Sequence, residues 1–77
     1  MSYWGSKYYL NEYEKETKKK KPIGCGAANS LSEALRQARN CIAKGGNIDN
    51  LFIEKYDADG YLDDVYIVKD ELAKVIA

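Results

Sequence analysis

The chain has 77 residues, with 12 basic and 12 acidic side chains, two cysteines, one proline and no histidine. This length predicts a single domain over residues 1–77, and the 45% hydrophobic fraction is typical of a globular protein rather than a disordered one. Without histidine, the usual nucleophile–base pairs and zinc sites are excluded, so we expect a protein that is not an enzyme and holds no cofactor or metal.

The N-terminal third of the sequence fits either a strand or a helix. Tyrosine and leucine side chains alternate loosely over residues 7–14, whereas acidic and basic residues four positions apart also suit a helix. We favour a strand because clustered tyrosines suit a sheet and no helix cap is present. A polar turn over residues 15–19 then leads to a second strand over residues 20–27, and Pro22 predicts that this strand lies at a sheet edge. One face of the second strand carries Ile23, Cys25 and Ala27.

The clearest element is a helix over residues 31–44. Ser30 stands at the expected N-cap and Glu33 follows three residues later, which is the spacing of a capping box. Apolar residues recur at helical spacing on one face: Leu31, Ala34, Leu35, Ala38, Cys41 and Ile42. The helix is expected to stop at Gly45, because glycine adopts the left-handed conformation after a helix without strain.

The last third of the sequence predicts a hairpin followed by a short helix. Residues 51–56 and 61–68 are rich in β-branched and aromatic side chains, and residues 57–60 between them have the composition of a turn. Acidic residues suit the first turn of a final helix over residues 70–76. The whole order predicts an α+β fold, a four-stranded antiparallel sheet (ββαββ) with the long helix on one face and a short C-terminal helix.

The predicted sheet carries hydrophobic side chains on both of its faces. On the face expected to pack against the long helix, the last hairpin presents Leu51, Ile53, Val65 and Ile67. On the other face it presents Phe52, Tyr56, Leu62, Tyr66 and Val68, which Tyr9 and Tyr13 join in a suitable register. A sheet with one wet face alternates apolar and polar residues, so this second face is expected to have a cover. The alternatives are the C-terminal tail, a second copy of the chain or another macromolecule.

The sequence therefore predicts a noncatalytic protein-interaction or regulatory module that forms a homodimer through this aromatic face and binds another protein. The predicted interface residues are Phe52, Tyr56, Tyr66, Val68 and Tyr13. Residues 1–22 hold six lysines against three acids, and residues 47–77 hold three lysines against eight acids, so charge is expected to orient the partners. Because no apolar run is long enough to span a membrane and no signal-peptide core is present, we expect a cytoplasmic protein without membrane contact.

Nucleic-acid or nucleotide binding is the alternative function. The phosphate-binding residues would be Lys18, Lys19, Lys20 and Lys21, together with Arg36 of the helix. The zero net charge and the acidic last hairpin argue against this function, since nucleic-acid-binding domains are usually basic. Asp57, Asp59 and Gly60 also form a fragment of a calcium-loop pattern, but their spacing fits a hairpin turn better.

Overall fold

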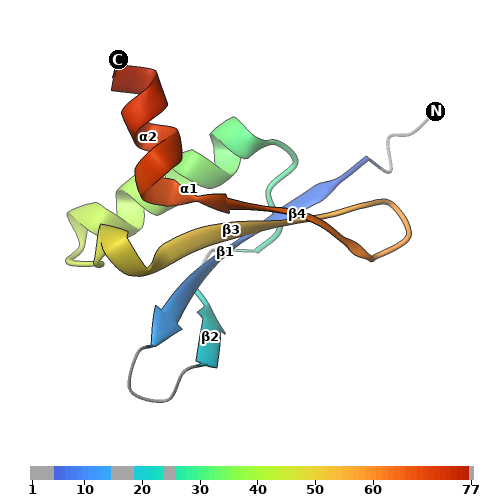
Figure 1. Cartoon of the computed structure of the whole chain (residues 1–77), viewed down its shortest axis with the longest axis horizontal. Helices are drawn as coiled ribbons and strands as arrows, with labels where there is room; N and C mark the ends of the chain where they lie inside the picture. Colours follow the sequence, from blue (N-terminus) through green and yellow to red (C-terminus); the bar gives the residue numbers. More distant parts are fainter. Residues whose placement is uncertain (1–4, 15–18, 24–25, 77) are drawn as a thin grey trace.

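The computed structural model describes residues 5–14, 19–23 and 26–76, and it confirms the predicted α+β fold (Figure 1). The elements in chain order are β1 (Lys7–Glu14), β2 (Lys19–Pro22), α1 (Leu31–Ala43), the short 3-10 turn η1 (Ile48–Asn50), β3 (Leu51–Tyr56), β4 (Leu62–Ile67) and α2 (Val68–Ile76). The four strands form one antiparallel sheet in the order β2-β1-β3-β4. The inner strands are therefore β1 and β3, and β2 and β4 lie at the edges.

The first two strands form as predicted, but the second strand is shorter than predicted. β2 lies at a sheet edge and ends at Pro22, whereas the sequence pattern predicts a strand as far as residue 27. Beyond this point the chain keeps two backbone contacts with β1. The Ile23 N–H donates to the Leu10 carbonyl at 3.1 Å, and Ala28 and Tyr8 form an isolated bridge.

The end of β2 changes which side chains of this segment face the core. Ile23 packs against the core, whereas Ala27 is exposed and Ala28 is fully buried. The prediction that Ile23 and Ala27 share one strand face is therefore wrong, because strand alternation does not continue once the pairing has ended. Cys25 and most of the predicted turn, residues 15–18, lie outside the described residues.

The helix α1 begins at the predicted cap. The Ser30 hydroxyl accepts the Glu33 N–H at 3.2 Å, which satisfies one of the free donors of the first turn. The Glu33 carboxylate accepts the N–H of Asn29 at 3.2 Å, so the return bond of the capping box is displaced by one residue. After the helix ends, Gly45 adopts a φ of +106°, a conformation that disfavours residues with a Cβ atom.

The predicted hairpin forms around a single organising aspartate. One carboxylate oxygen of Asp57 accepts the N–H of Asp59 at 2.9 Å and the N–H of Tyr61 at 3.0 Å. The Asp57 N–H in turn donates to the Tyr61 carbonyl at 2.9 Å, and Gly60 adopts a φ of +90°. These bonds close the turn and start β4 at Leu62, one residue later than predicted.

The core lies between one face of the sheet and the two helices. Its buried residues are Leu10, Ala28, Ala34, Leu35, Ala38, Leu51, Ile53 and Val68. α2 begins two residues earlier than predicted, its Val68 is fully buried, and Leu72 packs against the same cluster. An ion pair of 3.2 Å between Lys69 and Asp49 connects α2 to η1. α2 therefore lies beside α1 on the same side of the sheet (Figure 1), and it does not cover the other side.

Candidate interaction surface on the open face of the sheet

Strand register assigns every sheet residue to one of two faces. Residues that lie opposite each other in an antiparallel pair point to the same side. We call the side that packs against α1 and α2 the covered face, and the side opposite to it the open face. The covered face carries Leu10, Ile53 and Tyr66, which lie side by side across three strands. The open-face residues in the described strands include Tyr9, Asn11, Tyr13, Lys20, Phe52, Glu54, Tyr56, Leu62, Val65 and Ile67.

The predicted orientation of β4 is wrong. Val65 and Ile67, expected to pack against the long helix, lie on the open face because they are opposite Glu54 and Phe52. From the pair Lys55–Asp64 to the pair Phe52–Ile67, an even number of residues separates the opposed positions, so an odd-numbered residue of one strand shares its face with an even-numbered residue of the other. The register shift next to Tyr56 changes this parity at Leu62, which lies opposite Tyr56. The four-residue turn predicted from the sequence already implied this exchange.

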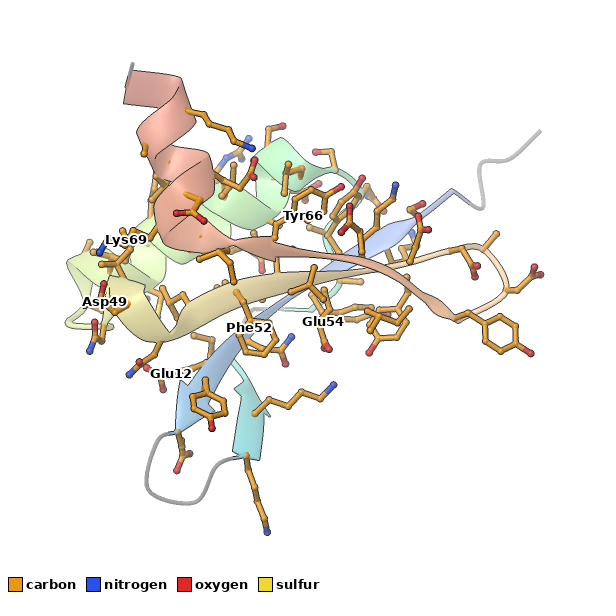
Figure 2. All side chains as sticks on the ribbon, viewed as in Figure 1. Glu12, Asp49, Phe52, Glu54, Tyr66 and Lys69 are labelled. Atoms are coloured by element: carbon orange, nitrogen blue, oxygen red, sulfur yellow. The ribbon has the colours of Figure 1, made fainter. Side chains whose placement is uncertain are left out.

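Two predicted interface residues consequently lie away from the open face. Val68 is fully buried in the core because the chain has already become helical at this position. Tyr66 packs against the core from the covered face, and its ring centroid is 6.3 Å from that of Tyr8. Figure 2 shows Tyr66 on one side of the hairpin and Phe52 with Glu54 on the other side.

The other three predicted interface residues lie on the open face. Phe52 and Tyr56 are half-buried, and Tyr13 is 40% exposed. The Tyr56 ring packs edge-on against Tyr9, with ring centroids 5.5 Å apart. β4 adds three large apolar residues to this face. Leu62 was predicted to lie here, whereas Val65 and Ile67 were not; the three are 53%, 44% and 46% exposed.

A buried carboxylate occupies the middle of the open face. Glu54 is 6% exposed, and its carboxylate accepts hydrogen bonds from Lys20 Nζ at 2.8 Å, from Asn11 Nδ2 at 3.1 Å and from the Tyr56 hydroxyl at 3.4 Å. The hydrogen bond and negative charge of Glu54 raise the pKa of the Lys20 ammonium above its ordinary value. Asn11 is itself buried and also donates to the Tyr9 carbonyl. The monomer thus satisfies this carboxylate from its own side chains.

The two sheet edges offer poor templates for adding another strand. The Asp64 carboxylate accepts the backbone N–H of Val65 at 2.8 Å, so this donor of β4 is occupied. β2 is only four residues long, is rich in lysine and ends in proline. Charge, proline and short length are the features by which proteins protect edge strands from pairing. Association through the open face is therefore less hindered than association through an edge.

Among the basic residues proposed as the alternative site, the structure describes the side chains of Lys19, Lys20 and Arg36, and these three do not lie in one cluster. Lys20 is bound to Glu54, and Lys19 is exposed at the sheet edge. Arg36 lies on the exposed side of α1, which belongs to the opposite face of the sheet, and Lys18 lies outside the described residues. Nucleic-acid binding remains a prediction, which a gel shift at low salt checks.

Neither similarity to known proteins nor a metal-binding cluster assigns a function to the part of the chain that the structure describes. Comparison with protein-family models, with curated proteins and with solved structures gives no match. Within residues 5–14, 19–23 and 26–76, no three side chains of the metal-binding types are grouped to hold an ion. In the same part of the chain, neither helix is long and apolar enough to cross a membrane.

Proposed function

We propose that the protein is a noncatalytic interaction module that self-associates through the open face of its sheet. One observation carries this proposal: seven large hydrophobic or aromatic side chains share the open face, which neither helix of the described residues covers, and five of them are at least 38% exposed. A large exposed apolar surface usually marks an interface, and here the apolar side chains surround a polar centre. The face residues are Tyr9, Tyr13, Phe52, Tyr56, Leu62, Val65 and Ile67.

The size of the open face suits a weak dimer. Strands about 4.8 Å apart and about 20 Å long give a four-stranded face a projected area of about 400 Å². Counting both copies and the relief of the side chains, face-to-face packing buries on the order of 1,000 Å², which is the lower limit for a specific interface. We therefore expect a dissociation constant of about 1 μM or weaker.

A second copy suits this face better than a strongly charged partner does. The chain has zero formal net charge, so two copies approach each other without overall repulsion. Its charges are also segregated, because β2 carries three lysines while β4 and the turn before it carry four aspartates. A two-fold arrangement can therefore bring the basic part of each copy close to the acidic part of the other. Binding of a further protein at the same surface remains part of the proposal.

Light scattering coupled to size exclusion tests the proposal over a range of protein concentrations. The native chain is expected to change from monomer to dimer as concentration rises. The double substitution V65S/I67S removes apolar contacts that are already half exposed, so the fold is expected to persist while the dissociation constant rises at least about tenfold.

A matched control separates the open face from exposed hydrophobic surface in general. Tyr61 is 72% exposed and lies in the hairpin turn outside the sheet, so Tyr61→Ser is expected to leave dimerisation unchanged. Circular dichroism at low concentration establishes that each variant is folded. A native chain that stays monomeric up to about 1 mM, or equal weakening by both variants, contradicts the proposal.

A further inference from the structure

The hairpin end of the open face contains an open cavity of about 500 Å³. Its lining residues are Lys7, Tyr9, Tyr56, Asp57, Ala58 and Gly60. This volume falls within the range of sites that bind small molecules or single side chains. Two of these residues, Tyr9 and Tyr56, also belong to the face proposed for self-association, and Asp57, Ala58 and Gly60 belong to the turn.

Two aromatic rings form adjacent walls of the cavity. The rings of Tyr9 and Tyr56 are inclined at 82° to each other, with their centroids 5.5 Å apart. Aromatic faces carry partial negative charge, and cations within about 6 Å of a ring centroid are attracted to them. A corner of two such rings therefore favours a positively charged group over a neutral or negative one.

A carboxylate is fixed at the same cavity. One oxygen of Asp57 accepts two backbone N–H groups of the turn, which holds the side chain in one orientation. Its negative charge remains, and Asp59 lies two residues further along the same turn. The only cationic group among the lining residues is the Lys7 ammonium, which donates to Asn29 Oδ1 at 2.7 Å. This bond ties the ammonium to the segment before α1.

We propose that this cavity binds an organic cation, namely the guanidinium group of an arginine side chain on a partner protein. A planar guanidinium stacks on a tyrosine ring while its N–H groups donate to a carboxylate, a combination that a compact ammonium does not provide equally well. Anions are disfavoured by the negative charge of Asp57. The site shares Tyr9 and Tyr56 with the self-association surface, so the monomer is expected to bind the cation and dimerisation through the open face is expected to compete with that binding.

The test is a titration of ¹⁵N-labelled protein with N-acetyl-arginine amide, followed through backbone amide chemical shifts. N-acetyl-citrulline amide is the matched control probe, because it has nearly the same shape without the positive charge. Arginine amide is expected to shift the signals of Tyr56, Ala58 and Gly60 in a saturable way at millimolar concentrations, while citrulline amide binds at least about fivefold more weakly.

Three substitutions give effects of predicted sign. Asp57→Asn retains an oxygen that accepts the turn N–H groups but removes the charge, so it is expected to weaken arginine-amide binding about fivefold. Tyr9→Leu keeps an apolar side chain but removes a ring, and is also expected to weaken binding. Lys7→Met removes the competing cation and is expected to tighten arginine-amide binding. Because this effect has the opposite sign, it tests the proposal even if Asp57→Asn disturbs the turn.

Outcomes that overturn this proposal differ from those that overturn the dimer. Equal shifts with the arginine and citrulline amides, or no change in affinity with Lys7→Met and Tyr9→Leu, mean that the cavity does not select a cation. The V65S/I67S variant is titrated in parallel. Retention of arginine-amide binding by this weakened dimer variant supports a site that the monomer forms by itself, and loss of binding by the folded variant contradicts the proposal.

Discussion

The two faces of this sheet distribute polar and apolar residues in opposite ways. On the covered face the centre is apolar, where Leu10 and Ile53 lie opposite each other and are almost completely buried. On the open face the centre is polar, with Glu54 buried among side chains that include the half-exposed Val65 and Ile67. The same strands thus build a buried core on the covered face. On the open face they place partly exposed apolar side chains around a buried carboxylate.

This difference shows how a small domain keeps an uncovered face stable as a monomer. The central carboxylate needs no partner chain, because Lys20, Asn11 and Tyr56 supply its hydrogen bonds. Burial without such partners would be costly. The surrounding apolar groups contribute to stability only in part while exposed, and association with a second copy would complete their burial.

The largest expected effect comes from comparing two isoleucines on opposite faces. Ile53→Ala removes a completely buried side chain, so we expect a loss of about 2–5 kcal/mol in the free energy of unfolding. A small domain has only about 5 kcal/mol in total, so this variant is expected to be largely unfolded or barely stable. Ile67→Ala, at a residue that is 46% exposed, is expected to cost less than about 1 kcal/mol.

Urea denaturation at concentrations below the dimer dissociation constant measures both variants. At these concentrations the monomer is compared with itself, so association does not contribute to the difference. Similar losses for both substitutions would mean that the open face is covered in solution, and the contrast between the faces would be wrong.

The elements of the fold were predictable because their signals are local. The capped apolar stripe from Ser30 to Ile42 and the Asp57–Gly60 turn chemistry lie within short windows of sequence. The orientation of β4 was predictable too, but it required counting the residues between opposed positions rather than assuming that one parity continues through a turn. Val68 was predicted to lie on the open face because valine is typical of strands, but it is the first residue of the helix α2.

The polar centre of the open face could not be predicted from the sequence. Glu54 and Lys20 are separated by 34 residues, and no pattern in either strand indicates that they meet. Their contact depends on two registers, Tyr9 opposite Glu54 and Tyr13 opposite Lys20. Register of this kind follows from the packing of the whole sheet and not from the propensity of any single residue.

An intermediate effect is expected when the polar centre of the open face is made apolar. Glu54→Leu removes a buried charge, and Lys20 is exposed enough to remain hydrated. We expect the free energy of unfolding to fall by about 1 kcal/mol, because buried Asn11 loses one acceptor while it keeps the Tyr9 carbonyl. Association is expected to become less specific, with species larger than a dimer, because the apolar patch becomes continuous.

Light scattering measures this change, and Glu54→Gln is the matched control. The glutamine retains an acceptor for Asn11 and keeps the centre polar, so a defined dimer is expected to persist. A Glu54→Leu chain that forms the same dimer as the native protein would show that the polar centre does not limit association.

The smallest expected effect is a decrease in the free energy of unfolding at alkaline pH, to which one residue on each face contributes. Lys20 on the open face has a pKa raised above 10.5 by the hydrogen bond and charge of Glu54, and Tyr66 on the covered face has a pKa raised above 10.0 by burial. A raised lysine pKa means that the ion pair contributes fully below about pH 10.5 and is lost as pH rises through the folded-state value. A raised tyrosine pKa acts in the same direction, because ionisation above about pH 10 favours the unfolded chain, in which the phenolate is hydrated.

Stability is therefore expected to fall above pH 10 through both faces, and two conservative substitutions separate their contributions. Tyr66→Phe keeps the ring but removes the ionisation, and Lys20→Arg keeps a positive charge throughout this range. We expect Tyr66→Phe to flatten the alkaline decrease more than Lys20→Arg does, because the Lys20 side chain is 54% exposed and its ion pair is screened by solvent. Urea midpoints between pH 9 and about pH 11.5 measure the decrease. If Lys20→Arg reduced the alkaline loss of stability more than Tyr66→Phe did, the larger pH-dependent contribution would come from the open face. The Lys20–Glu54 ion pair would then stabilise the monomer more than the exposure of Lys20 implies.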